Sequence, residues 1–157
     1  YSLLGTIYIG FPLGSALLIR LADDGYELLI IALLCTFATD TCSFTVGRLW
    51  GRTKMAPSIS PGKTWEGAIG GLIGSAAVAL GLIIILDFQI SIWLAISIGL
   101  LTAVLAQIGD LGESKLKRIA GVKESGVLIP GHGGMLDRLD SLTLVLPFVY
   151  CTSIVLR

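Results

Sequence analysis

Five long apolar stretches constrain the fold of this chain more than any other feature. Of its 157 residues, 54% are hydrophobic and 14% are charged, whereas about a quarter of the residues in a soluble domain are charged. The hydrocarbon core of a bilayer is crossed by about 20 mainly apolar residues in a helix. We therefore expect an all-α protein, a polytopic transmembrane helical bundle with about five spans, at 1–20, 27–47, 64–86, 90–109 and 136–156.

Lysine and arginine are concentrated in two of the connections between these stretches. Cytoplasmic connections of membrane proteins carry an excess of both residues, so we expect the second–third and fourth–fifth connections to lie on the cytoplasmic side. The N-terminus would then be inside and the C-terminus outside. The net charge is zero, which argues against a nucleic-acid partner. The cations of the two connections are Arg48, Arg52, Lys54, Lys63, Lys115, Lys117, Arg118 and Lys123.

Four carboxylates flank the fourth–fifth connection: Asp110, Glu113, Asp137 and Asp140. Two helix ends on the same side of the membrane bring these acids to one depth, and Asp110, Ser114 and Lys117 share a helix face by their spacing. Oxygen ligands without Cys or His companions suit a hard cation such as Mg²⁺. The alternative is that the acids form interfacial salt bridges with Arg118 and Arg138.

A glycine-rich loop at 130–134 lies between Arg118 and Asp137. Successive backbone N–H groups in such a loop form an anion-binding nest, and the loop leads into a helix N-terminus, where the helix dipole favours phosphate. Within it, His132 could donate to a phosphate oxygen or shuttle a proton. The alternatives are a flexible turn and a histidine without a catalytic role.

The second span and the connection after it hold further candidates. Asp40 lies inside an apolar stretch, where an ionisable residue is expected by default to have a function. The alternative is that Asp40 forms a structural ion pair with Arg48, two turns on. Ser60 and Pro61 suit the cap and first turn of the third helix. Lys63 could contact a phosphate, although basic connections also anchor proteins to anionic headgroups.

Metal-binding acids, cations and a glycine nest beside lipid suggest phosphoryl or nucleotidyl transfer onto a lipid. The rival from another class is a transporter or channel in which Asp40 lines an ion pathway. Transporters concentrate polar groups near the bilayer midplane. Here all the candidate groups except Asp40 lie near one interface, which favours an enzyme.

Several motifs occur together between Thr39 and Ser141, about two-thirds of the chain. They are Ser60-Pro61-x-Lys63-Thr64-Trp65-Glu66-Gly67, Gly109-Asp110-Leu111, Ser114-Lys-Leu-Lys117-Arg118, Lys123-Glu124, His132-Gly133-Gly134 and Asp137-Arg138-Leu139-Asp140. In this set the chain resembles the integral-membrane phosphatidate cytidylyltransferases, or CDP-diacylglycerol synthases. It departs from the family pattern at Glu124, where Asp is usual, and at Gly62, where Lys is common. Family members are also usually longer at the N-terminus.

The resemblance implies that CTP and phosphatidate react to give CDP-diacylglycerol and pyrophosphate in phospholipid biosynthesis, with Mg²⁺ as cofactor and a second cation left open. It implies one transmembrane catalytic domain over 1–157, lacking N-terminal spans of the family, in a bacterial inner membrane with the active site facing the cytoplasm. CTP, phosphatidate and membrane lipids are the expected partners, and a homodimer is compatible with the glycine-rich third span. The alternatives are a CTP-dependent polyprenol or phytol kinase and a CDP-archaeol synthase.

The resemblance also implies roles for individual residues. Asp110 and Asp137 resemble the metal ligands of the family. The expected catalytic residues are Asp110, Asp137, Asp140, Lys117, Arg118 and His132. The expected substrate-binding set is Lys63, Ser60, Arg138, Gly133, Gly134, Lys123 and Asp40.

Overall fold

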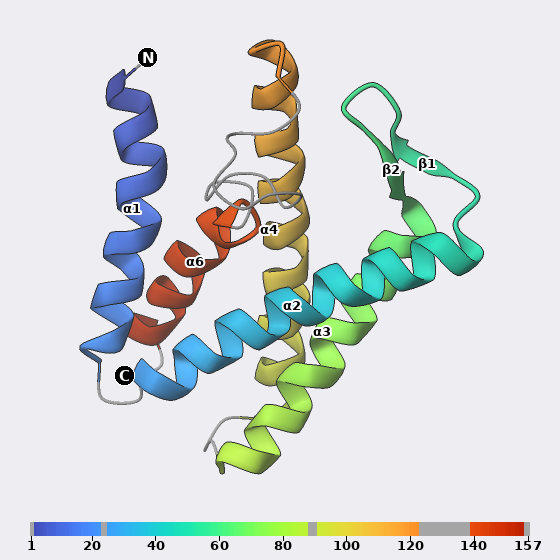
Figure 1. The fold of residues 1–157 in the computed structure, drawn as a ribbon. Helices are drawn as coiled ribbons and strands as arrows, with labels where there is room; N and C mark the ends of the chain where they lie inside the picture. Colours follow the sequence, from blue (N-terminus) through green and yellow to red (C-terminus); the bar gives the residue numbers. More distant parts are fainter. Residues whose placement is uncertain (1, 23–24, 88–90, 123–138, 156–157) are drawn as a thin grey trace, which may run out of the picture.

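The computed structural model describes residues 2–22, 25–87, 91–122 and 139–155. Its helices fall on the five apolar stretches, which confirms the expected all-α helical membrane architecture (Figure 1). A short antiparallel hairpin, which the sequence did not predict, joins α2 to α3. In chain order the elements are α1 (Ser2–Arg20), α2 (Gly25–Trp50), β1 (Lys54–Ala56), β2 (Ser60–Thr64), α3 (Trp65–Leu86), α4 (Ile92–Ile119) and α6 (Leu142–Val155).

Three of the described helices, α2, α3 and α4, are long and apolar enough to cross a membrane. The other two described helices, α1 and α6, have shorter apolar segments, Gly5–Arg20 and Leu142–Val155. In Figure 1 the hairpin and the C-terminal end of α4 lie toward the same end of the molecule. The cations of the hairpin and those on the last turns of α4 therefore lie toward one end of the described molecule.

Helix α4 continues well past the predicted boundary at residue 109. It ends at Ile119, where Gly121 adopts a positive φ of 71° and its N–H donates to the Arg118 carbonyl at 3.1 Å. The Val122 N–H donates to the Lys117 carbonyl at 3.0 Å, which completes a glycine-containing helix cap. Asp110, Glu113, Lys115, Lys117 and Arg118 thus lie on the C-terminal turns of this helix.

The predicted start of the third helix at Ser60 was wrong. Ser60 belongs to β2 and pairs with Ala56 of β1, and the helix begins at Trp65. Thr64 is the N-cap, because its hydroxyl accepts a hydrogen bond from the Gly67 N–H at 3.2 Å. Pro61 fits the short strand, since an edge strand tolerates a residue without a backbone donor.

The base of the hairpin is fixed to the first turn of α3. The Thr53 N–H donates to both carboxylate oxygens of Glu66, at 3.1 and 3.2 Å. In the opposite direction, the Trp65 N–H donates to the Thr53 carbonyl at 3.0 Å. These bonds determine where the side chains of β2 are held.

Helices α2 and α3 pack closely through glycines, small residues that let helix backbones approach each other in a membrane. A Cβ atom at Gly67 would lie 2.6 Å from the Ser43 carbonyl oxygen and 3.1 Å from the Gly47 Cα. At Gly70 it would lie 2.6 Å from a methyl carbon of Val46. The two backbones therefore approach too closely for a larger residue at these positions.

Buried polar contacts and an apolar cluster hold the remaining helices together. The Ser75 hydroxyl of α3 donates to the Gly99 carbonyl of α4 at 2.8 Å. The apolar cluster joins α1, α2, α4 and α6, and its members include Ile19, Leu28, Ala106, Leu142 and Val145. Together these contacts fix the end of α4 relative to α2 and to the start of α6.

Candidate active site

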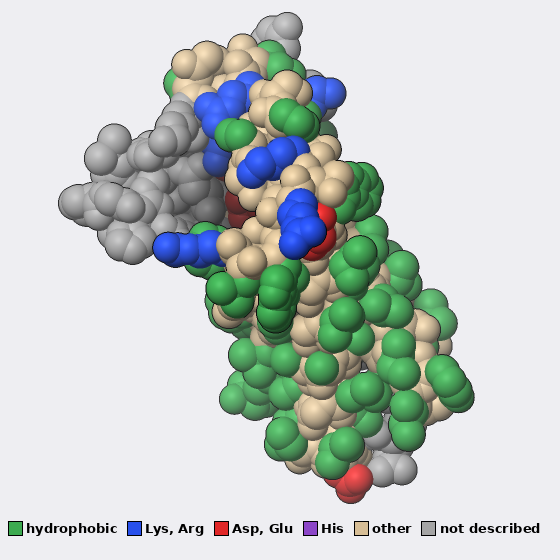
Figure 2. Space-filling model, turned by 90° about the vertical axis from the view of Figure 1, so that its right-hand side faces the viewer, with side chains coloured by type: hydrophobic (Ala, Val, Ile, Leu, Met, Phe, Trp, Pro, Cys, Tyr) green, Lys and Arg blue, Asp and Glu red, His purple; other side chains and the backbone are tan. Residues whose placement is uncertain are grey.

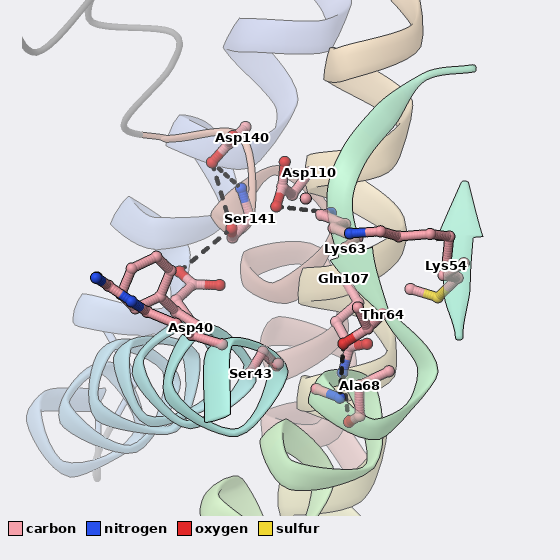
Figure 3. Close-up of a pocket in the computed structure, with 16 residues that line it drawn as sticks. Asp40, Ser43, Lys54, Lys63, Thr64, Ala68, Gln107, Asp110, Asp140 and Ser141 are labelled. Carbon is pink, nitrogen blue, oxygen red and sulfur yellow. Dashed lines mark hydrogen bonds and ion pairs between the residues drawn. The ribbon is translucent and has the colours of Figure 1, made fainter. Parts of the chain in front are cut away.

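A cavity of about 590 Å³ lies between the hairpin, the ends of α2 and α4, and the residues that lead into α6. Figure 3 shows polar side chains from all of these elements directed toward one another. The cavity also has apolar lining, which includes Phe44 of α2 and Met55 of β1. Its principal polar residues are Asp40, Ser43, Lys63, Gln107, Asp110 and Asp140.

Lys63 and Asp110 form the central ion pair of this cavity. The Lys63 Nζ lies 2.7 Å from the Asp110 Oδ2, and the two side chains are 20% and 30% exposed. On the same face of α4, the Ser114 hydroxyl donates to the Asp110 Oδ1 at 3.4 Å, as the helical spacing predicted. The pair places a cation from the hairpin against an acid on α4.

Asp140 and Asp40 are brought together by Ser141. The Ser141 N–H donates to the Asp140 Oδ1 at 2.6 Å, and its hydroxyl lies 3.3 Å from that oxygen and 3.5 Å from the Asp40 Oδ2. The alternative pairing of Asp40 with Arg48 is not among the ion pairs of the described residues. Burial, with a contribution from the charge of Asp110, raises the pKa of Asp140 to about 7, which is typical of a carboxyl in a functional site.

Whether the site suits a divalent cation depends on its donor atoms. Asp40, Asp110 and Asp140 supply only oxygen, as Mg²⁺ prefers, and the ammonium group on Asp110 shows that this carboxylate accommodates a cation. Within the described residues, however, no three His, Cys, Asp or Glu side chains are close enough to hold a metal. The donors fit, but the described residues alone do not complete a metal site.

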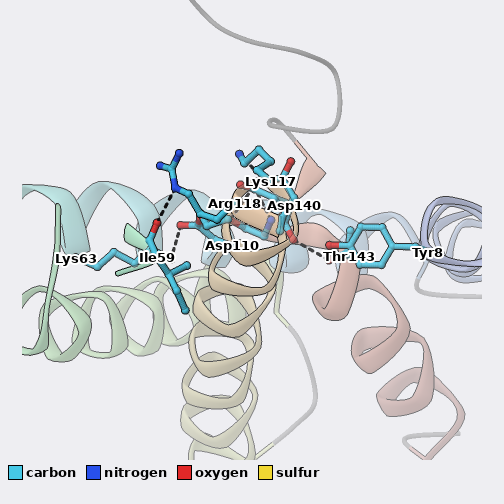
Figure 4. Close-up of polar contacts among 11 residues, drawn as sticks. Tyr8, Ile59, Lys63, Asp110, Lys117, Arg118, Asp140 and Thr143 are labelled. Atoms are coloured by element: carbon cyan, nitrogen blue, oxygen red, sulfur yellow. Dashed lines mark hydrogen bonds and ion pairs between the residues drawn. The ribbon is translucent and has the colours of Figure 1, made fainter. Parts of the chain in front are cut away.

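The other predicted residues on α4 contact neighbours outside the cavity lining. The Lys117 Nζ lies 2.8 Å from Glu113, and the Arg118 Nε donates to the Ile59 carbonyl at 3.3 Å (Figure 4). Asp110 and Glu113 therefore pair with lysines, and the alternative of ion pairs with Arg118 is wrong for them. Ser60 lies in β2 and is not one of the residues that line the cavity.

The remaining predicted site residues lie outside the described residues. These are Lys123, Glu124, His132, Gly133, Gly134, Asp137 and Arg138, together with the loop 130–134.

Gln107 is a cavity residue that the sequence analysis missed. Its Nε2 donates to the Ala68 carbonyl at 3.3 Å, so it connects α4 to α3 at the base of the cavity. The available signal was a single amide in an apolar stretch, three residues before Asp110 and hence on the same helix face.

The surface around the cavity has two zones. In Figure 2, Lys and Arg side chains gather over the upper part of the face, and hydrophobic side chains cover the lower part. Large exposed apolar residues such as Ile69, Ile73 and Ile84 belong to α3, which is long enough to span a bilayer. The fold and site thus define an integral membrane protein with a charged cavity at one end of its apolar helices.

Comparison with known proteins places the chain within this class. The model of the cytidylyltransferase family matches residues 1–156, and the chain belongs to that family. It is 43% identical over 149 residues to a phosphatidate cytidylyltransferase of Staphylococcus saprophyticus and 42% identical to that of Staphylococcus haemolyticus. Each match covers 95% of this chain and 56% of the relative, so the chain spans about half the length of these curated relatives.

Proposed function

We propose that this protein transfers CMP from CTP to phosphatidate, giving CDP-diacylglycerol and pyrophosphate. The observation that carries the proposal is the Lys63–Asp110 pair in a cavity at the boundary between basic and hydrophobic surface. A water-soluble triphosphate and a membrane lipid could both reach such a place. Membership of the cytidylyltransferase family and the names of the relatives support the same reaction.

In the proposed reaction, an oxygen of the lipid phosphate attacks the α-phosphorus of CTP. A bond between that oxygen and phosphorus forms while the bond to the bridging oxygen of the β-phosphate breaks, and pyrophosphate leaves. The protein contributes positioning and charge stabilisation, as in other phosphoryl transfers. In this proposal Lys63 donates to phosphate oxygens, which its position in the cavity supports, and Asp40 and Asp140, joined through Ser141, are further acids.

Mg²⁺ is the proposed cofactor, held by Asp110 and by Asp137, with a second cation left open. When bound, such an ion neutralises charge on the attacking and leaving oxygens. The all-oxygen donors and the cation already resting on Asp110 support this assignment. The Lys63 ammonium would then neutralise phosphate charge from the hairpin side of the cavity.

The cavity is proposed to face the cytoplasm of a bacterial inner membrane. Support comes from the positive charge of the two connections at that end and from the bacterial relatives. Ser58→Cys, at an exposed position between the two strands, tests the orientation in a background that also carries Cys42→Ser and Cys151→Ser, because these two native cysteines are not buried. A membrane-impermeant maleimide should label the introduced cysteine in inverted membrane vesicles and not in intact cells; labelling in intact cells would reverse the assigned orientation.

The position of the label in CTP distinguishes the proposed reaction from a kinase. With phosphatidate and Mg²⁺, α-³²P-CTP should give a labelled lipid, whereas γ-³²P-CTP should give labelled pyrophosphate only. A CTP-dependent polyprenol or phytol kinase would instead place the γ-label on its lipid. A comparison of isoprenoid and diacyl acceptors in the same assay distinguishes a CDP-archaeol synthase from the proposed enzyme. A purified protein that consumes no CTP would contradict the proposal.

A further inference from the structure

Helix α4 carries an ion pair with a buried carboxylate, and this pair has no role in the reaction proposed above. Glu113 is 1% exposed and Lys117 is 17% exposed, and the Lys117 Nζ lies 2.8 Å from the Glu113 Oε2. Both lie beyond Asp110 on the last turns of α4, where Figure 4 labels Lys117. Glu113 is also close enough to Asp140 for its charge to contribute to the raised pKa of that residue.

The surroundings of Glu113 indicate that the pair has a purpose other than stability. Within the described part of the chain, Lys117 is the cation that pairs with Glu113, and the Asp140 carboxyl lies within hydrogen-bond reach of it. Burying such a pair has a desolvation cost that can exceed the attraction, and an apolar replacement is often equally stable. What the buried carboxylate does fix is the position of the Lys117 ammonium at the end of a flexible side chain.

Lys117 is also well placed along the helix. Lys63 contacts α4 at Asp110, and Lys117 is two turns further on, a rise of about 10 Å. The two lysines thus place ammonium groups at successive points along the end of α4. An ammonium donates through as many as three N–H groups, so the Glu113 contact does not by itself prevent donation to a phosphate.

We propose that Glu113 is a positioning residue: it holds the Lys117 ammonium where it meets the phosphates of a nucleoside triphosphate entering the cavity. Glu113 itself does not touch the substrate. The inference rests on the proposed function, because it assigns the Glu113–Lys117 pair to the binding of CTP.

A set of matched variants separates positioning from a purely structural role. Glu113→Gln should raise the KM for CTP by about tenfold or more, the effect of losing one charge-assisted contact. The double variant Glu113→Gln/Lys117→Met removes both charges and should unfold at about the wild-type temperature, yet its KM should stay high. Lys115→Met, at an exposed position of the same helix, is the control with unchanged KM. A double variant that recovers both stability and KM would overturn the proposal.

Chemical labelling tests the same inference without turnover. The purified protein is treated with an amine-acylating reagent, with and without CTP and Mg²⁺, and acylation at each lysine is measured by mass spectrometry. Added CTP should slow acylation of Lys117 in the wild type and not in Glu113→Gln, while exposed Lys115 reacts equally in all samples.

The two readouts distinguish this inference from the proposed function. Protection of Lys117 without cytidylyl transfer would overturn the proposed function and support the inference that Glu113 prepares a nucleotide-binding lysine. Cytidylyl transfer without protection of Lys117 would overturn the inference alone. Absence of both would overturn both.

Discussion

The ammonium of Lys63 lies 2.7 Å from the carboxylate of Asp110, and this contact joins the β1–β2 hairpin to the end of α4. A second contact, from the Arg118 Nε to the Ile59 carbonyl at 3.3 Å, connects the same two elements. The hairpin is therefore attached at its turn, through Ile59, and within its second strand, through Lys63. One face of the cavity depends on these contacts, so the site can be tested through the hairpin and through α4 separately.

We expect Lys63→Met to lower kcat/KM for CTP by about 100-fold or more, the usual effect of removing one preorganised charge or donor at a reacting group. The methionine keeps most of the side-chain length and removes the ammonium beside Asp110. The measurement is cytidylyl transfer with α-labelled CTP. Lys115→Met, an exposed position on α4, should retain wild-type activity, and a fully active Lys63→Met variant would remove Lys63 from the proposed site.

Metal dependence is the second prediction. EDTA should abolish cytidylyl transfer and excess Mg²⁺ should restore it. In Asp110→Asn, turnover should fall by about 100-fold or more, because an amide does not neutralise the cation that a carboxylate holds. Asp87→Asn is the matched control: Asp87 lies at the other end of α3 with a φ of 52°, a conformation that Asn tolerates. Equal losses in both variants would contradict a specific role for Asp110.

Much of the fold follows from the sequence, because a bilayer-length apolar stretch leaves few alternatives to a helix. All five predicted stretches contain helices. The boundary of α4 was misplaced because charged residues were taken to end the span. A helix ends where its backbone hydrogen bonding stops. In α4 this bonding continues to the cap at Gly121.

The hairpin and its contacts were beyond the reach of sequence patterns. Strands of three and five residues are too short to show clear alternation. The sequence indicated that Lys63 and Asp110 would lie on the same side of the membrane. Their direct contact depends on how Thr53, Glu66 and Thr64 fold the hairpin back, which spacing alone does not reveal.

Close packing of α2 and α3 gives the third prediction. Gly67→Ala should destabilise the protein by about 1–3 kcal/mol, the usual cost of overpacking, because its Cβ would lie 2.6 Å from the Ser43 carbonyl oxygen. Gly81→Ala is the control on the same helix, since a Cβ there meets nothing within 4 Å, and alanine is favoured over glycine within a helix. Thermal unfolding in detergent measures both. Equal stability of the two variants would contradict the close approach at Gly67.

The Thr64 hydroxyl gives the last prediction, because it links the hairpin that carries Lys63 to the first turn of α3. It accepts from the Gly67 N–H at 3.2 Å, and Thr64 is 4% exposed. Thr64→Val removes the hydroxyl and keeps the shape, so it should cost about 1 kcal/mol of stability, as the loss of a helix cap does. Because the cap directly follows Lys63, we also expect the KM for CTP to rise. Thr64→Ser retains the hydroxyl and should keep the KM near the wild-type value. If Thr64→Val lost stability while its KM matched that of Thr64→Ser, the cap would stabilise α3 without positioning Lys63.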